Sequence, residues 1–365
     1  MILKELTDYI ESFAPLCYQE SYDNSGLLIG SSSSITNKAI ISLDVTEAVM
    51  DEAITEGADL VIAHHPLIFR GIKNINNNTE TGRCIIKAIK NGIAVYIAHT
   101  NLDNIITGVN NKICNKLGLV NCEILSPVNG QLSKLVTFIP MEYKEKVQEA
   151  LFSAGAGHIG NYDSCGFTTD GTGSFRGNEA SNPFTGSSGK LHFEPEARFE
   201  TIFPSYLKNK IVKALLESHP YEEVAYDIYQ LDSRYQLVGS GMTGELTEET
   251  GEEEFLRKAQ KVFKQKVIRH SPLIGKKVKR VAVCGGAGSF LIPEAIRSQS
   301  TVFLTGDLKY HQFFEAENKI VLADIGHFES EQYTCELFYE LIMKKFPNFA
   351  VRLTEIDTNP VNYLI

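Results

Sequence analysis

The chain has 365 residues, of which 43% are hydrophobic and 22% charged, and its formal net charge is −10. This balance is typical of a soluble globular protein with two or three domains. The negative charge excludes a general attraction to nucleic acid, and no apolar run approaches the roughly 20 residues of a membrane-spanning helix. The seven cysteines are scattered, odd in number and without a C-x-x-C pair, which predicts free thiols and a cytoplasmic location.

The first 130 residues alternate between helical and strand patterns. Leu3, Leu6, Ile10 and Phe13 have helical spacing and predict an opening amphipathic helix. A strand over 38–44, a helix over 47–56 and a strand over 60–63 predict a right-handed βαβ unit with parallel strands. The other elements expected here are a turn and strand over 22–30, a helix over 82–91, a strand over 93–98 and a helix over 108–117.

Histidines and carboxylates follow three apolar strands at the points where these strands end. They are His64 and His65 after the strand over 60–63, His99 and Asp103 after the strand over 93–98, and His327 and Glu331 after the strand over 319–326. Ligands of open α/β sheets bind at the carboxyl edge of the strands, so we expect these side chains to meet in one pocket. Imidazoles and carboxylates without thiolates argue against a closed structural zinc site.

The expected ligands are too many for one catalytic zinc ion, which usually has three protein ligands and water. The five are His64, His65, Asp103, His327 and Glu331. They predict two divalent ions per chain that share a carboxylate, either Asp103 or Glu331. Two ions roughly 3.5–4 Å apart can activate water and clamp both oxygens of a displacement. Zinc is the first choice, with iron, manganese or nickel as alternatives.

Other polar residues near these strand ends have two interpretations. His99 and His311 are candidates for acid–base catalysis, or they are ordinary hydrogen-bonded histidines. Asp103 also lies near the start of the next predicted helix, where a negative charge is favoured in any case. Asp23 and Asn24 either shape a turn or line the rim of the metal pocket.

The character of the sequence changes near residue 129. Its expected elements are a strand over 132–140, a helix over 143–155, a short strand over 166–169, a strand over 198–203, a helix over 204–217 and a strand over 224–230. This β-α-β-β-α-β order predicts an inserted α+β ferredoxin-like domain over 129–232, and a discontinuous core over 1–128 and 233–365. The glycine- and serine-rich stretch 157–190 is interpreted as a flexible insertion or, alternatively, as a ligand loop.

After a linker over 239–244, the α/β pattern returns. We expect a helix over 255–263, strands over 279–284, 301–307 and 319–326, a helix over 290–298 and a terminal helix over about 331–345. Strand, helix and strand over 279–305 echo those over 38–63, which predicts two related βα halves with the site in their crevice. The glycine-rich turn 285–289 either binds a phosphate through its N–H groups or is only a tight turn.

Four motifs resemble the signatures of the NIF3-like (DUF34) family, whose members are often labelled GTP cyclohydrolase 1 type 2 homologues. They are Tyr22–Gly30, Ala63–Pro66, His99–Asp103 and Gly326–Glu331. By matching position, the resemblance implies that the five expected ligands hold a dinuclear metal centre. The segment His219–Asp227 resembles the extra domain of the long family members, which is similar to PII and CutA proteins.

The resemblance also implies a toroidal homohexamer with an inner cavity and an unidentified small-molecule substrate. Our first hypothesis is a metal-dependent hydrolase acting on a nucleotide-like or phosphate-bearing molecule, with GTP ring opening as its most specific version. The alternative is a non-enzymatic metal-binding or regulatory oligomer whose inserted domain senses a small molecule. Metal-dependent turnover separates the two hypotheses.

Overall fold

The computed structural model describes residues 1–364, which form two compact units. The first unit joins Met1–Pro127 to the chain from Gln236 onward, and the second is Val128–Tyr235. No helix within residues 1–364 combines the length and the apolar character needed to cross a membrane. The mixed α/β class expected from the sequence is confirmed, since both units combine helices with sheets.

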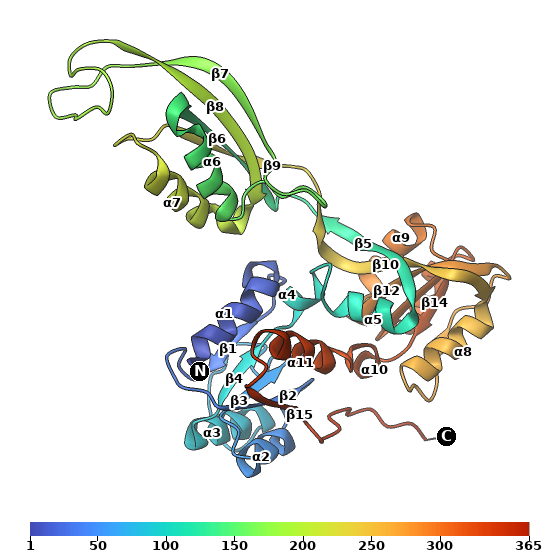
Figure 1. Ribbon diagram of the computed structural model, residues 1–365. Coiled ribbons are helices and arrows are strands. Elements are labelled where there is room, and N and C mark those ends of the chain that lie inside the picture. Colours follow the sequence, from blue (N-terminus) through green and yellow to red (C-terminus); the bar gives the residue numbers. More distant parts are fainter. Residues whose placement is uncertain (365) are drawn as a thin grey trace. The chain divides into compact units, whose positions relative to one another are not determined.

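The first sheet of the first unit has the strand order β1-β4-β3-β2-β15 (Figure 1). Its strands are β1 (Gly26–Ile29), β2 (Lys38–Ser42), β3 (Leu60–Ala63), β4 (Ala94–Ile97) and β15 (Ala350–Leu353). The helices of this part are α1 (Leu3–Phe13), α2 (Glu47–Thr55), α3 (Glu80–Asn91) and α4 (Thr100–Asp103). The next helix, α5 (Val109–Leu117), contacts the second sheet of this unit. Strands β15, β2, β3 and β4 are parallel, and β1 runs antiparallel to β4.

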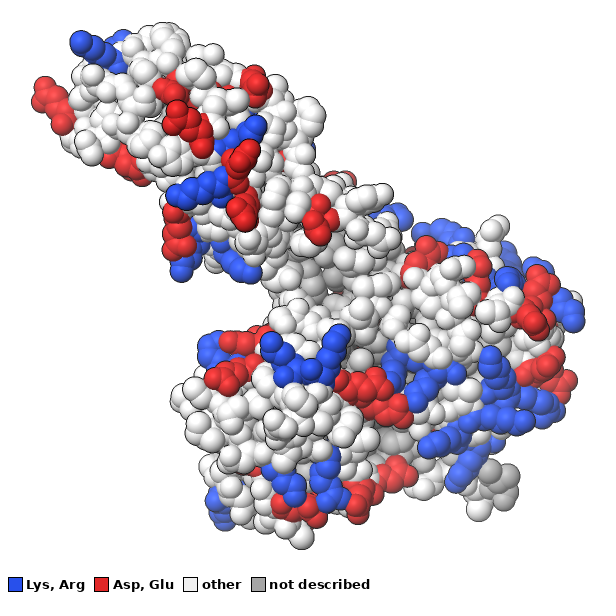
Figure 2. All heavy atoms as spheres, viewed as in Figure 1, with Lys and Arg blue, Asp and Glu red and all other residues white. Residues whose placement is uncertain are grey.

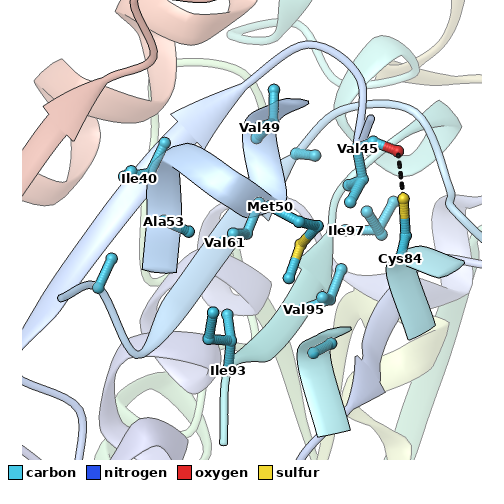
Figure 3. Close-up of a cluster of buried hydrophobic side chains, with 13 residues drawn as sticks. Ile40, Val45, Val49, Met50, Ala53, Val61, Cys84, Ile93, Val95 and Ile97 are labelled. Carbon is cyan, nitrogen blue, oxygen red and sulfur yellow. Dashed lines mark hydrogen bonds between the residues drawn. The ribbon is translucent and has the colours of Figure 1, made fainter. Parts of the chain in front are cut away.

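A buried cluster joins this sheet to α2 and α3 (Figure 3). Val49, Met50 and Ala53 of α2 are fully buried against Val61 of β3 and Val95 of β4. Every residue of β3 and β4 is buried, as in parallel strands that are covered on both faces. The core therefore fixes the positions at which these two strands end, and His64 and His99 follow at those ends.

The second sheet of the same unit has the order β11-β14-β13-β12-β10-β5. Its strands are β5 (Leu119–Val128), β10 (Tyr235–Gly251), β11 (Arg269–His270), β12 (Lys277–Ala287), β13 (Val302–Gly306) and β14 (Val321–Asp324). The helices of this part of the chain are α8 (Glu252–Val262), α9 (Ile292–Arg297) and α10 (His327–Glu331). The last helix, α11 (Thr334–Lys345), contacts β2 and β15 of the first sheet. Strands β12, β13 and β14 are parallel, and β11 runs antiparallel to β14. The strands β11, β14, β13 and β12 therefore run in the same relative directions as β1, β4, β3 and β2 of the first sheet.

Some expected boundaries were wrong, mainly at glycines. The stretch 239–244, expected as a linker, lies within β10, where Met242 pairs with Val283 of β12. Strand β12 also continues to Ala287, so the turn expected at 285–289 begins later. The terminal helix is two helices, α10 and α11. Local pattern did not reveal β15 or the two-residue β11, because short edge strands carry little periodic signal.

The second unit has a four-stranded antiparallel sheet of order β7-β8-β6-β9. Its elements are β6 (Leu132–Pro140), α6 (Lys144–Ser153), β7 (Gly166–Phe175), β8 (His192–Pro204), α7 (Lys208–Ser218) and β9 (Tyr226–Leu231). Leu135, Leu151, Phe199, Phe203 and Leu215 form a buried core between the helices and the sheet. Strand β7 pairs with β8 from Gly166 to Phe175, so residues 166–175 of the stretch interpreted as a flexible insertion form one strand of a long hairpin (Figure 1).

Candidate metal centre

The adjacent histidines His64 and His65 lie at the carboxyl end of β3, where the chain leaves the sheet. The backbone N–H groups of both residues donate to the carbonyl of Leu43, at 3.2 and 2.9 Å. Side chains of neighbouring residues on an extended strand point in opposite directions. Here the turn before Pro66 brings both rings into one cluster, with their centroids 5.0 Å apart.

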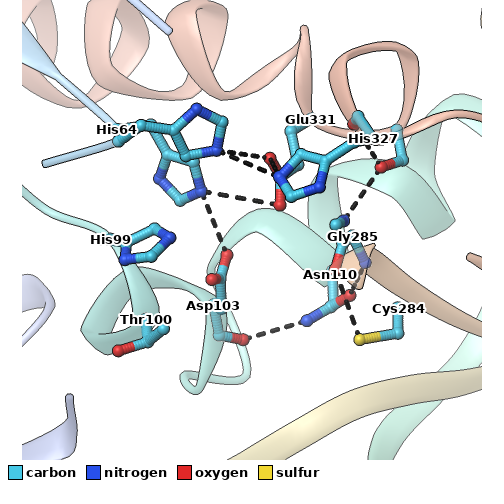
Figure 4. A network of polar contacts seen from close by, with 12 residues as sticks. His64, His99, Thr100, Asp103, Asn110, Cys284, Gly285, His327 and Glu331 are labelled. Carbon is cyan, nitrogen blue, oxygen red and sulfur yellow. Dashed lines mark hydrogen bonds and ion pairs between the residues drawn. The ribbon is translucent and has the colours of Figure 1, made fainter. Parts of the chain in front are cut away.

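The carboxylate of Glu331, at the end of α10, lies at the centre of this cluster (Figure 4). Its Oε2 atom lies 2.9 Å from Nε2 of His65 and 3.2 Å from Nε2 of His327. Its Oε1 atom lies 3.8 Å from Nε2 of His64, which is also 3.5 Å from Oδ1 of Asp103. The structure therefore brings together all five side chains expected as metal ligands.

Each histidine of the cluster is oriented by an oxygen acceptor on its Nδ1 atom. The pairs are His64 with the Ala98 carbonyl at 2.9 Å, His65 with Asp44 at 2.7 Å, His99 with Asp23 at 2.8 Å and His327 with Asp307 at 2.7 Å. An acceptor at Nδ1 fixes the ring tautomer that leaves Nε2 available, and this is the arrangement of metal-binding histidines.

Two buried atoms of the cluster lack hydrogen-bond partners among residues 1–364. They are Nε2 of His64 and Oδ1 of Asp103, whose residues lie side by side in Figure 4. A buried polar atom without a partner costs about 1–3 kcal/mol, so this pair favours a ligand between them. Within the described part of the chain, three groups of side chains have ligand atoms close enough to hold a metal ion: His64, Asp103 and Glu331; His65, His327 and Glu331; and His64, His65 and His99. The donor set thus fits a divalent metal.

Burial and hydrogen bonding shift the pKa values of the cluster in opposite directions. Burial lowers the pKa of His64, which keeps its imidazole neutral. Burial also lowers the pKa of His65, but hydrogen bonds to Asp44 and Glu331 outweigh it and raise the pKa to about 9. His327 follows the same logic, with Asp307 and Glu331 raising its pKa to about 11. Without a metal, protons on these two rings therefore balance the charge of Glu331.

Carboxylates of the cluster are also perturbed. Burial raises the pKa of Asp103 well above its ordinary value, and Glu331 raises it further. For Glu331, the facing imidazoles of His327, His64 and His65 overcome the effect of burial and hold the pKa well below its ordinary value. Two neighbouring acids with such different environments are typical of functional sites.

Strand β12 approaches the cluster closely because its end consists of glycines. Gly286 has φ +62°, and a Cβ atom there would lie 2.5 Å from Oε1 of Glu331. Asn110 of α5 links β12 to the residue Asp103. Its side chain donates to the Asp103 carbonyl at 3.0 Å and accepts from the Gly285 N–H at 2.9 Å. The N–H groups of Gly286 and Gly288 donate to Ser330 and Thr305. The phosphate alternative for 285–289 is weakened, because these donors are already used.

The remaining candidate residues have different surroundings. His99 belongs to the cluster, and its ring centroid lies 5.1 Å from that of His64. Asp23, weighed as a rim residue, accepts from His99, whereas Asn24 donates to the Ile68 carbonyl. His311 is exposed, and its ring contacts within residues 1–364 are with Tyr310 and Phe314. The catalytic roles of His99 and His311 stay predictions.

Two carboxylates that orient the histidines were not expected as site residues from the sequence. Asp44 follows β2 and Asp307 follows β13, and they accept from His65 and His327. Their signal was available, since both end apolar strands at the same sheet edges as the histidines. In addition, Asp103 lies at the end of the short helix α4, and not at the start of α5 as expected.

A cavity of about 620 Å³ opens beside the cluster. Its wall includes Asp44, His65, Asp307 and His327, together with Arg269, which pairs with Asp324. Residues 359–361 and Tyr363 of the C-terminal segment line the cavity as well. Thr358 in the same segment donates to Asp44 at 2.7 Å, so this segment contacts the carboxylate that orients His65.

Comparisons with known proteins agree with this architecture. The model of the family described as Duf34/NIF3 (NGG1p interacting factor 3) matches residues 1–360. Proteins named "GTP cyclohydrolase 1 type 2 homolog" from Halalkalibacterium halodurans and Bacillus subtilis are each 39% identical to the chain. The alignments cover 97% and 99% of this chain, and 96% and 98% of those proteins.

A solved structure gives the same result. The crystal structure of a Bacillus cereus protein related to NIF3 superposes with a TM-score of 0.88 at 38% identity, covering 99% of both chains. Sequence and structure thus agree over nearly the whole chain, and the chain belongs to the Duf34/NIF3 (NGG1p interacting factor 3) family.

Proposed function

We propose that the protein is a dinuclear-metal hydrolase that acts on a nucleotide-like or phosphate-bearing small molecule. His64 and Asp103 would hold one divalent ion, and His65 and His327 would hold the other. Glu331 would be shared between them. Zinc is the first choice, and iron, manganese or nickel also suit imidazole and carboxylate ligands.

The observation that supports two ions best is the orientation of Glu331. Its Oε2 atom contacts His65 and His327, whereas its Oε1 atom faces His64. Asp103 belongs to only one of the three groups suited to a metal ion, while Glu331 belongs to two. Of the two carboxylates that the sequence left open for sharing, the geometry therefore favours Glu331.

Two side chains beside the proposed metal centre, His99 and Arg269, would assist the reaction. When bound, a pair of divalent ions lowers the pKa of water and stabilises negative charge on a substrate. His99, held at Nδ1 by Asp23 and lying against His64 and His65, is placed to move a proton at its Nε2 atom. Arg269 is the only lysine or arginine among the described residues that line the adjacent cavity. Its Nη2 atom contacts Asp324 and the Leu308 carbonyl, and its Nη1 and Nε atoms would position a phosphate. The names of the relatives support a nucleotide as the substrate.

The test is metal-dependent turnover. Purified protein, stripped with a chelator and reloaded with a single metal, would be assayed against GTP and a phosphodiester. We expect activity only in the reloaded protein, with losses of at least 100-fold in His64→Ala and Glu331→Ala. Glu340→Gln, at an exposed position of α11, is the matched control and should keep full activity. If no metal restores turnover on any substrate, the hydrolase proposal fails.

The alternative function is a metal-binding regulator whose inserted domain senses a small molecule. The strand order β7-β8-β6-β9 with helices α6 and α7 supports a ferredoxin-like domain for Val128–Tyr235. A cavity of about 710 Å³ within this unit favours ligand binding there. Binding of a small molecule by metal-loaded protein that has no turnover would support this alternative.

We also propose that the chain assembles into a homohexamer and works in the cytoplasm. Seven free cysteines agree with a reducing compartment. The face shown in Figure 2 carries both basic and acidic side chains, and the lysines and arginines are densest at its lower right. Light scattering should give six times the chain mass of 40.6 kDa, and a monomer would contradict the hexamer.

A further inference from the structure

The cavity of the second unit contains a buried carboxylate. Glu196 of β8 is only 7% exposed, and its Oε1 atom accepts a hydrogen bond of 2.9 Å from the hydroxyl of Tyr221. Its Oε2 atom has no hydrogen bond, and no lysine, arginine or histidine pairs with it among residues 1–364. Because Oε2 is not one of the buried atoms without a partner, it is open to the cavity, where its negative charge is available to a cation.

Aromatic rings surround this carboxylate. The ring centroid of Tyr221 lies 6.0 Å from that of Phe175 and 6.2 Å from that of Phe184. All three rings line the cavity of about 710 Å³, together with Phe138. Gly173 leaves the space that Glu196 fills, since a Cβ atom there would lie 2.0 Å from Oε2 of Glu196.

The remaining charges of the cavity are mostly acidic. Asp170, Glu222 and Glu223 line it, against the two cations Arg176 and Arg198. Arg198 is engaged elsewhere, since it pairs with Glu200. Aromatic faces and a buried carboxylate in one cavity are the usual means of binding an organic cation, because both attract positive charge while the rings accept its apolar body.

We infer that this cavity binds a small organic cation, an ammonium or guanidinium group on an apolar body, with Glu196 as its counter-charge. The rings of Phe175, Phe184 and Tyr221 would contact the apolar part. This site lies entirely within the second unit and does not depend on the proposed metal centre. It would give the inserted unit a ligand of its own.

Binding of matched probes to the full-length protein tests the inference. Calorimetry and ligand-observed NMR would compare choline with its uncharged carbon analogue 3,3-dimethylbutan-1-ol, and would include agmatine as a guanidinium probe. We expect at least one cation to bind with a Kd below about 1 mM, at least ten-fold tighter than the uncharged analogue. Equal binding of the charged and uncharged probes, or no cation binding below 10 mM, would overturn the inference.

Variants locate the site. Glu196→Gln keeps the shape of the side chain and should weaken cation binding at least ten-fold, whereas Glu217→Gln, on the exposed side of α7, should not change it. Tyr221→Phe keeps the ring and removes the donor to Glu196, so an altered affinity in this variant also places the ligand here if Glu196→Gln does not fold. His64→Ala should leave binding intact, which separates this site from the metal centre. Unchanged affinity in folded Glu196→Gln, or binding of a divalent metal in place of the organic cations, would show that the assignment is wrong.

Discussion

The Oε2 atom of Glu331 lies 2.9 Å from Nε2 of His65, although 266 residues separate the two along the chain. His65 follows a strand of the first sheet, and Glu331 ends the helix after the last parallel strand of the second sheet. The contact therefore exists only when both halves of the first unit are folded and packed. The candidate site therefore forms only when the two halves pack together, and loss of metal binding should reveal loss of this packing.

The number of bound ions should show that the two proposed metal positions, His64 with Asp103 and His65 with His327, can be lost separately. Wild-type protein is expected to bind two divalent ions per chain. His327→Ala and His64→Ala should each retain about one ion, and Glu331→Gln should retain fewer than one, because Glu331 belongs to both groups. Elemental analysis of dialysed protein measures this. A single ion in the wild type, or two in Glu331→Gln, would contradict a shared carboxylate.

Asp44 should control metal affinity without being a ligand. It accepts from Nδ1 of His65 at 2.7 Å, so Asp44→Asn keeps an acceptor but removes its charge. Loss of such a supporting carboxylate typically weakens metal binding 10–100-fold. Competition with a chromophoric chelator would measure the change. Asp51→Asn, at an exposed acid on α2, should bind metal like the wild type.

The metal-free protein should lose stability as the pH rises. The pKa of His65 is raised from 6.5 to about 9, so its favourable contribution is complete below pH 6.5 and is lost as the pH passes 9. The loss is on the order of 3 kcal/mol. Urea unfolding between pH 6 and 10 should show this decline in chelator-treated wild type and a shallower one in Asp44→Asn. Equal slopes would argue against the Asp44–His65 interaction as the cause.

Metal affinity should rise with pH over the same range. A metal ion must displace the protons that the raised pKa values of His65 and His327 maintain in the metal-free protein. The logarithm of the affinity should therefore increase by up to about two units per pH unit below pH 9. Titrations at pH 6, 7 and 8 in one buffer series would test this. An affinity independent of pH would exclude these two imidazoles as ligands.

Gly286 should be required for the site, and a second glycine provides a matched control. Gly286 and Gly57 have φ values of +62° and +64°, but a Cβ atom would meet Glu331 at 2.5 Å at position 286 and nothing within 4 Å at position 57. Alanine at either position should cost about 1–2 kcal/mol of backbone strain. Only Gly286→Ala should also lose metal binding. Normal metal content in Gly286→Ala would show that the close approach of β12 is not needed.

The sequence by itself determined where the candidate ligands lie along the chain. The apolar run before His64 predicted β3, and Pro66 predicted its end. Both signals are local, because burial on two faces makes a parallel strand continuously apolar and proline cannot continue it. The same reasoning placed His99 after β4 and His327 after β14. Family membership was also readable, since its four motifs are short and linear.

Only the tertiary structure decided how these residues meet. Asp103 and Glu331 were equivalent candidates for a shared carboxylate, and the packing of the two sheets alone places Glu331 against both histidine groups. The pairing of Asp44 with His65, and the strand formed by 239–244, likewise depend on contacts between distant segments. Local periodicity carries no information about such contacts, because they form only when the surrounding core brings the segments together.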